Sequence, residues 1–103
     1  MQPDTVSLGF DTSTSYCVVS VVSGDLILAE ISEEASKNHA ERLMYLIEDT
    51  LASAKLSLNN LNSIGVGVGP GNFTGIRVSV AAARGLSLAL KIPAFGVSRF
   101  ETL

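Results

Sequence analysis

The sequence predicts a single α/β domain in which helices pack against a mixed five-stranded sheet. Three short strand-like segments joined by tight turns open the chain, and two further strand-like segments alternate with helical patterns after them. The length of 103 residues, with 47% hydrophobic and 17% charged residues, suffices for one core and excludes a disordered tail. The mean hydropathy of +0.38 is high for so small a domain, which predicts that some apolar surface meets a partner.

The first third of the chain predicts an antiparallel meander. Residues 6–11 alternate along a strand pattern that ends in an acid, and residues 16–22 are rich in valine. A turn at Gly24 and Asp25 leads to a third strand over residues 26–32. Because tight turns join these strands, each is expected to pair with its neighbour in the antiparallel sense.

The middle of the chain predicts an amphipathic helix. Asn38, with Glu41 three residues later, forms a capping-box pattern at its start. Apolar residues then recur at helical spacing, at Ala40, Leu43, Met44, Ile47, Leu51 and Ala54.

The last part predicts two crossover units. A strand, a helix, a second strand and the cap of a third helix are expected at residues 63–68, 74–90, 94–97 and Ser98. The resulting order, βββαβαβ(α), is that of a ribonuclease-H-like lobe, the half-unit of the actin-like and sugar-kinase (ASKHA) ATPases. Function does not follow from this fold alone.

Several features predict a cytoplasmic protein without a membrane anchor. No apolar run approaches the ~18 residues that span a bilayer, and Met1–Phe10 contains no basic residue and has no signal-peptide pattern. The single Cys17 forms no internal disulfide and is expected to be an inert core thiol. His39 is the only histidine, so metal catalysis has little support and a capping or packing role is favoured.

The charge of the chain is unevenly distributed. The net charge is −3, yet residues 1–36 contain six acids and no Lys or Arg, while the rest has seven basic residues against four acids. An acidic chain is a poor free-standing nucleic-acid binder, because contacts to phosphates supply most non-specific affinity. Any RNA is therefore expected to be held by a partner.

Two segments are candidates for a phosphate site. Asp11 is followed by three hydroxyl residues at the first hairpin, a composition that suits a phosphate and its Mg²⁺, although Asp, Ser and Thr are also ordinary turn residues. The loop Gly69–Gly75 follows a strand and opens a helix, where backbone N–H groups favour anions. It is neither a Walker loop nor a dinucleotide fingerprint, and the alternative is a tight turn capped by Thr74. The candidate residues are Asp11, Thr12, Ser13, Gly69, Gly71, Thr74 and Gly75.

The helix expected over residues 74–90 has an unusual composition. Arg77 lies in its first turn, where the helix dipole opposes a cation, so a partner carboxylate or a phosphate would offset the cost; the alternative is a solvated side chain. Small residues occur on both faces, which predicts a second contact beyond the core. Gly85 costs about 1 kcal/mol relative to Ala in mid-helix, which predicts a packing requirement there.

Four segments carry a resemblance to a known family: LGFDTST, NHAERL, GVGPGNFTGIR and GLSLAL, at residues 8–14, 38–43, 67–77 and 85–90. The chain resembles the bacterial TsaB (YeaZ) family of tRNA threonylcarbamoyladenosine biosynthesis proteins, from about Val6 to Leu103. The resemblance implies a role in installing threonylcarbamoyl on the adenosine beside the anticodon of ANN-decoding tRNAs. It implies a TsaD-like paralogue that performs the transfer, a TsaE-like ATPase, and tRNA held only through the complex.

The resemblance also implies that this chain is not the catalytic member. The catalytic paralogue carries an Asn-His-x-x-x-His metal pair, and here Arg99 and Leu103 stand where the two histidines would be. Family members are two-lobed and longer, so the chain is expected to be a single N-terminal lobe over residues 1–103 without the second lobe. This lobe alone is expected to bind ATP weakly or not at all, while the intact complex can use ATP or ADP with Mg²⁺.

In this family the first two helices form the face that pairs with TsaD, and self-pairing into a homodimer is expected without that partner. The residues implied are Leu43, Met44, Ile47, Arg77, Val80 and Arg84, of which Leu43 and Ile47 could instead be core. A different class of function is the nucleotide-binding lobe of an actin-like or sugar-kinase-like phosphotransferase, with Asp11 holding Mg²⁺. A peptidase would need metal ligands or a nucleophile pair, and the sequence offers neither.

Overall fold

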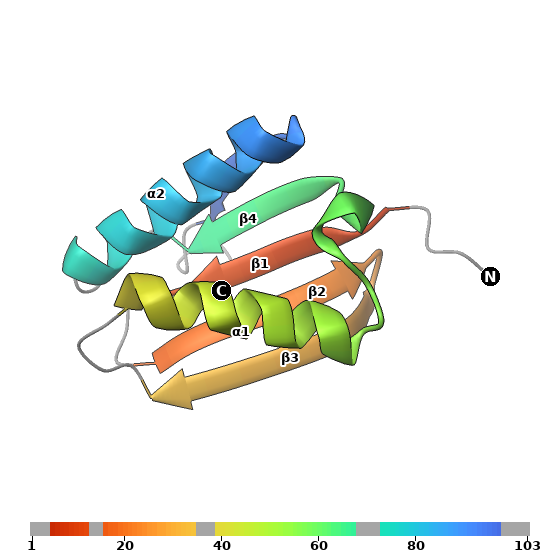
Figure 1. Cartoon of the computed structure of the whole chain (residues 1–103), viewed down its shortest axis with the longest axis horizontal. Helices are drawn as coiled ribbons and strands as arrows, with labels where there is room; N and C mark the ends of the chain where they lie inside the picture. Colours follow the sequence, from red (N-terminus) through yellow and green to blue (C-terminus); the bar gives the residue numbers. More distant parts are fainter. Residues whose placement is uncertain (1–4, 13–15, 35–38, 68–72, 98–103) are drawn as a thin grey trace.

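A computed structural model describes residues 5–12, 16–34, 39–67 and 73–97 of the chain (Figure 1). Its elements follow the expected order: β1 (Ser7–Asp11), β2 (Tyr16–Ser23), β3 (Leu26–Glu34), α1 (His39–Ser53), η1 (Leu58–Asn60), β4 (Ser63–Gly67), α2 (Phe73–Leu90) and β5 (Ala94–Val97). The short 3-10 helix η1 is an element that the sequence patterns do not predict. The cap residue Asn38 and the helix expected from Ser98 lie outside the described residues.

The five strands form one mixed sheet in the order β3-β2-β1-β4-β5. β1 pairs with β2 and β2 with β3 in the antiparallel sense, whereas β1–β4 and β4–β5 are parallel. Leu8 lies opposite Val21 on one side and opposite Ile64 on the other. The predicted meander and mixed sheet are therefore confirmed.

Both helices lie on the same face of the sheet, with α1 across the meander and α2 across β4 (Figure 1). The two crossovers, β3–α1–β4 and β4–α2–β5, step across the sheet in the same direction. Because such crossovers are right-handed, each one delivers its helix to that same face.

The core fills the space between this face and the two helices. Leu43 and Ile47 of α1 are completely buried there, together with Leu8, Val19, Val21 and Ile64 of the sheet. Burying each of these two helix side chains stabilises the domain by about 1.5–3 kcal/mol. The structure therefore corrects the expectation that Leu43 and Ile47 face a partner: both are core residues.

The opposite face of the sheet has a different character. Within the described residues no helix covers it (Figure 1). Its side chains are small or polar along β1 and β4, whereas β2 and β5 also present the larger apolar side chains Val18, Val22 and Phe95 there. Ser7 and Ser63, which are paired in the β1–β4 register, share a hydrogen bond of 2.7 Å between their Oγ atoms. Gly9 and Gly65 continue this row of small residues.

Both helices end with a lysine in the left-handed region, where glycine is the usual residue. Lys55 follows α1 with φ 60°, and Lys91 follows α2 with φ 58°. The Leu56 N–H donates to the Leu51 carbonyl at 2.9 Å, which closes the last turn of α1 in a Schellman pattern. The same pattern at α2 joins Ile92 to Ser87.

Two different contacts hold the helices to the sheet. Arg42 of α1 donates two hydrogen bonds to the Glu33 carboxylate of β3, at 2.7 Å from Nε and 2.5 Å from Nη2. Both side chains are partly exposed, so this ion pair is a surface contact. On α2, the Ser79 and Thr12 hydroxyls share a hydrogen bond of 2.5 Å, and both residues are completely buried.

Candidate functional site

The first candidate site lies where β1 and β4 end side by side. Asp11 is the last residue of β1, and Gly67 is the last residue of the parallel strand β4. A Cβ atom on Gly67 would stand 2.5 Å from Cγ and Oδ2 of Asp11, so only glycine permits this close approach. The carboxyl ends of parallel strands are the usual ligand-binding edge of α/β sheets. The structure thus brings Asp11 to the strand end from which residues 68–72 lead into α2.

The described residues cover only part of the predicted phosphate site. Ser13, Gly69 and Gly71 lie outside them, and Thr74 and Gly75 are described as backbone within the first turn of α2. The phosphate site therefore stays a prediction that depends on Asp11 and on the start of α2.

Thr12 has a different role from the one the sequence suggests. Its side chain is completely buried and its Oγ1 lies 2.5 Å from Oγ of Ser79. A buried hydroxyl that already has a partner is not presented to a phosphate in solution. The structure corrects the expectation: Thr12 anchors the first hairpin to α2, and Ser79 is its counterpart.

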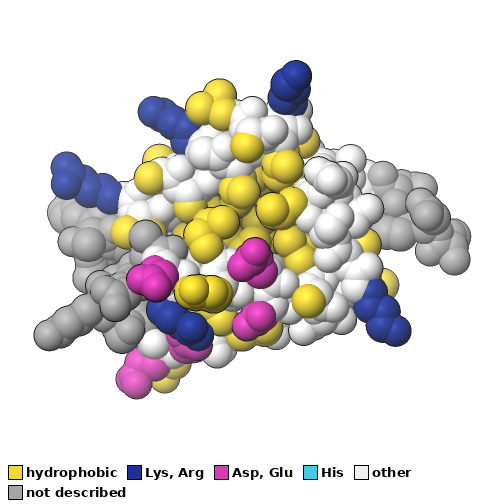
Figure 2. Space-filling view, in the orientation of Figure 1, with side chains coloured by type: hydrophobic (Ala, Val, Ile, Leu, Met, Phe, Trp, Pro, Cys, Tyr) yellow, Lys and Arg dark blue, Asp and Glu magenta, His cyan; other side chains and the backbone are white. Residues whose placement is uncertain are grey.

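The second candidate site is the outer face shared by α1 and α2 (Figure 2). We call it the two-helix face and define it by the exposed residues of both helices that recur at helical spacing: Glu41, Met44, Tyr45, Glu48 and Asp49 of α1, with Arg77, Val80, Ala81, Arg84, Gly85, Leu88 and Ala89 of α2. Met44 is 39% exposed, Val80 38% and Leu88 73%, so apolar side chains contribute to this surface. Four of the six predicted interface residues therefore lie on it: Met44, Arg77, Val80 and Arg84.

The two-helix face is divided by charge. The acids Glu41, Glu48 and Asp49 all belong to α1, whereas α2 carries Arg77 and Arg84 and no acid. In Figure 2 the acidic side chains lie on the α1 side, basic side chains border the α2 side, and hydrophobic atoms lie between them. A partner surface with apolar residues between a basic and an acidic border would match this pattern.

Gly85 lies in the middle of α2 on this face. Among the described residues, no atom of the surrounding structure lies within 4 Å of the position of its missing Cβ. The expected packing requirement is therefore not found in the part of the chain that the structure describes. Relative to alanine, Gly85 costs the helix about 1 kcal/mol, and it leaves the backbone of α2 open to a close neighbour.

Several α1 residues of the two-helix face were not singled out from the sequence. Tyr45, Glu48 and Asp49 are exposed because they lie opposite the apolar stripe, and the same helical spacing that reveals the stripe reveals them. Arg42, which borders them, also lies over the Tyr45 ring at 6.0 Å from its centroid.

The titratable groups of this region agree with structural roles. Burial raises the pKa of the Cys17 thiol to about 11, with a further contribution from the Glu33 carboxylate, so the thiol is protonated at neutral pH. The hydrogen bond from Arg42 lowers the pKa of Glu33 below its usual value. Cys17 is buried, as expected for a core thiol.

Two further observations concern metals and membranes. In residues 5–12, 16–34, 39–67 and 73–97, no three His, Cys, Asp or Glu side chains come together in a group able to bind a metal ion. Among the helices that the structure describes, none combines the length and the apolar character needed to cross a bilayer.

Known proteins match both the sequence and the fold. The family model for TsaD, tRNA N6-adenosine threonylcarbamoyltransferase, matches residues 30–103. The tRNA threonylcarbamoyladenosine biosynthesis protein TsaB of Buchnera aphidicola subsp. Schizaphis graminum is 41% identical over 95% of this chain and 46% of that protein. The chain belongs to the TsaD family and, within it, to the TsaB (YeaZ) group.

The structure of a TsaB-group member agrees with this assignment. YeaZ from Pseudomonas aeruginosa superposes with a TM-score of 0.84 at 34% identity, over 91% of this chain and 44% of that one. The present chain thus spans less than half the length of these two TsaB-group proteins. ROK hexokinase from Thermus thermophilus, with a TM-score of 0.64 at 23% identity over 91% of this chain and 35% of that one, shares the fold alone. The ribonuclease-H-like, actin-like fold is confirmed.

Proposed function

We propose that this chain is the partner-binding lobe of a non-catalytic subunit in the complex that installs threonylcarbamoyl on the adenosine beside the anticodon of ANN-decoding tRNAs. A TsaD-like paralogue performs the transfer, and the present subunit activates it by pairing with it. Membership of the TsaB group supports the pathway, since relatives of this group are named for threonylcarbamoyladenosine biosynthesis.

The observation that carries the proposal is Gly85 on the two-helix face. A mid-helix glycine that no contact with the described residues requires lowers the stability of the free chain. Its benefit arises when another backbone approaches α2 more closely than an alanine would allow. The exposed apolar side chains of Met44 and Val80, on the same two-helix face, supply area that such a docked helix would bury.

The sequence supports a non-catalytic role. Arg99 and Leu103 occupy the positions at which the resemblance locates the metal-binding histidines of the catalytic paralogue. Neither side chain is a metal ligand, because Arg stays protonated and Leu has no donor atom.

The remaining partners follow from the same proposal. The net charge of −3 favours contact with tRNA through the complex rather than through this chain. A TsaE-like ATPase joins the pair in the cytoplasm, and the lobe forms a homodimer through the two-helix face when the TsaD-like partner is absent.

A nucleotide belongs to the intact complex in this proposal. Asp11 and the start of α2 would face the phosphates and Mg²⁺ of ATP or ADP, while a second lobe would hold the adenosine. The alternative is a phosphotransferase lobe, favoured only by the closeness of Asp11 to the end of β4. Calorimetry separates the two: millimolar ATP affinity of this chain agrees with the proposal, and micromolar affinity supports the alternative.

The proposed pairing is tested by size exclusion with light scattering, on this chain alone and mixed with a TsaD-like paralogue. We expect a one-to-one complex that replaces the homodimer, and loss of that complex in Val80→Glu. Ile27→Glu is the matched control, because Ile27 is 59% exposed on the distant β2–β3 hairpin. A chain that stays monomeric and unpaired, or equal loss in both variants, would contradict the proposal.

A further inference from the structure

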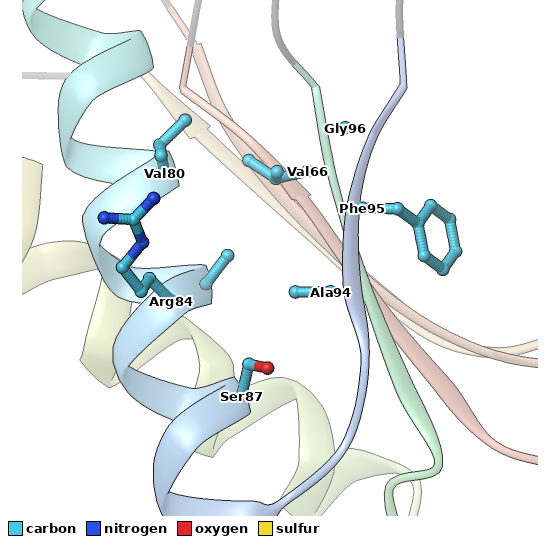
Figure 3. Close-up of a pocket in the computed structure, with 8 residues that line it drawn as sticks. Val66, Val80, Arg84, Ser87, Ala94, Phe95 and Gly96 are labelled. Atoms are coloured by element: carbon cyan, nitrogen blue, oxygen red, sulfur yellow. The ribbon is translucent and has the colours of Figure 1, made fainter.

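A groove lies between α2 and the edge strand β5, with a volume of about 370 Å³ (Figure 3). Its floor is formed by Val66 of β4 and Ala83 of α2, which are both buried. Val80 and Ala94 form the two sides. The groove exists because β5 directs only Ala94 and Gly96 toward α2, and these residues leave the space beneath the helix unfilled.

The register of β5 explains this arrangement. Ala94 is paired with Ile64 and Gly96 with Val66, so both point to the helix-covered face of the sheet. Phe95 between them points to the other side of the strand, away from α2 (Figure 3).

The outer edge of β5 offers backbone groups for a further strand. The Ile64 N–H donates to the Pro93 carbonyl at 3.0 Å, so the backbone carbonyl of Pro93 faces β4. Because backbone groups alternate along a strand, the N–H and C=O groups of Ala94 and Gly96 face away from β4. In the part of the chain that the structure describes, β5 is the last strand of the sheet, so these groups lie at an open edge there.

Among the described residues that line the groove, Arg84 is the only charged one. Arg84 lies at the rim on α2, and α2 contains no acidic residue. Ser87, the other polar residue of the lining, already donates its hydroxyl hydrogen to the Ile92 carbonyl at 2.5 Å. The rim therefore complements a carboxylate beside an apolar side chain.

We infer that this groove and the edge of β5 bind an extended peptide segment of a partner protein, with an aliphatic residue and an acidic residue two positions apart. The segment adds to the sheet as a sixth strand next to β5. Residues i and i+2 of a strand point to the same face, so the aliphatic side chain enters the groove while the carboxylate meets Arg84. This binding uses neither the nucleotide nor the TsaD-like partner. Because the groove shares Val80 and Arg84 with the two-helix face, Gly96→Val, which lies outside that face, separates failure of this inference from failure of the proposed pairing.

The test uses the chain alone with the blocked pentapeptide Ac-Thr-Val-Thr-Glu-Thr-NH2, followed by NMR. We expect amide hydrogen exchange at Ala94 and Gly96 to slow on saturation, while exchange at Phe95 stays unchanged because its groups face β4. The same peptide with Lys in place of Glu is expected to bind at least about tenfold more weakly.

Two variants and one control assign the binding to the groove. Gly96→Val fills the space beside α2 with a residue suited to strands and is expected to abolish binding. Arg84→Glu, a surface change that leaves the core intact, is expected to weaken binding at least about tenfold. Arg77→Glu makes the same charge change on the same helix outside the groove and is expected to leave the affinity within about twofold, because exposed charges at a distance are screened.

Three results would overturn the inference. The first is unchanged exchange at Ala94 and Gly96 at millimolar peptide. The second is equal binding of the acidic and basic peptides, or equal weakening by Arg77→Glu and Arg84→Glu. The third is self-association of the chain that Gly96→Val abolishes, since the groove would then belong to a second copy.

Discussion

The helices α1 and α2 lie side by side on one face of the sheet, yet they are built in different ways (Figure 1). α1 buries several large aliphatic residues against the meander and presents acids to solvent, whereas α2 buries Leu86 with the small residues Ser79 and Ala83 and presents arginines and a glycine. α1 is tied to the sheet by a surface ion pair with Glu33, and α2 by a buried hydroxyl pair with Thr12. α1 thus supplies most of the helical part of the core, while α2 carries a glycine that costs stability and the exposed side chains on which the proposed pairing depends.

The largest expected change in the free energy of unfolding distinguishes the buried side of α1 from its exposed side. Leu43→Ala removes a completely buried side chain and is expected to destabilise the domain by about 2–5 kcal/mol. Met44→Ala, one residue along but exposed, is expected to cost less than about 0.5 kcal/mol. Urea unfolding measures both, and similar losses would show that Met44 also belongs to the core.

The next effect concerns the buried link between α2 and the first hairpin. Thr12→Val or Ser79→Ala removes this buried hydrogen bond, at an expected cost of about 1–3 kcal/mol each. The double variant is expected to lose clearly less than the sum, because the same hydrogen bond cannot be lost twice. Exposed Ser53→Ala serves as the control, and strict additivity in the urea series would contradict a direct interaction.

A smaller effect of opposite sign is expected at Gly85. Gly85→Ala fills open space on an exposed helix surface and is expected to stabilise the free chain by about 0.5–1 kcal/mol. The same change is expected to weaken pairing through the two-helix face, because a Cβ then separates the two backbones. Thermal unfolding and light scattering measure the two effects.

The reverse substitution, from alanine to glycine at another exposed position of α2, controls for the effect of helix propensity alone. Ala81→Gly, also exposed on α2, is expected to destabilise the chain by about 1 kcal/mol. Unchanged pairing in Gly85→Ala would show that the glycine does not serve a close approach of two backbones.

The smallest effect is pH-dependent and concerns α1. Arg42 lowers the pKa of Glu33 in the folded state, so the pair contributes stability above the ordinary value of 4.5 and loses it as the pH falls through the lowered pKa. Glu33→Gln is therefore expected to lower the melting temperature slightly at neutral pH and to match the parent chain in strong acid. Glu30→Gln, exposed on the same strand, is the control, and a difference that persists in acid would assign the effect to packing.

Local patterns predicted the elements but not every contact within them. The strand and helix spans agree closely with the structure, because hydrophobic periodicity and glycine or proline punctuation act over a few residues. Pro93 marked the end of α2, whereas the end of α1 carried no such signal; at both ends a lysine, Lys55 or Lys91, occupies the left-handed position in which glycine is usual. The Asp11 segment was singled out from its composition, whereas the contact between Asp11 and Gly67 joins residues distant in sequence and depends on the parallel β1–β4 pairing.

The order of elements, the mixed sheet and the family were all predictable from the amino-acid sequence, because they depend on local periodicity and on motifs that stand close together in the chain. Tertiary packing determined which side chains of a helix are buried in the core and which are exposed. Leu43 and Met44 are neighbours in one apolar stripe, yet packing against the sheet buries the first and exposes the second. Thr12 meets Ser79, and a groove forms between α2 and β5, only because the tertiary fold brings these segments together.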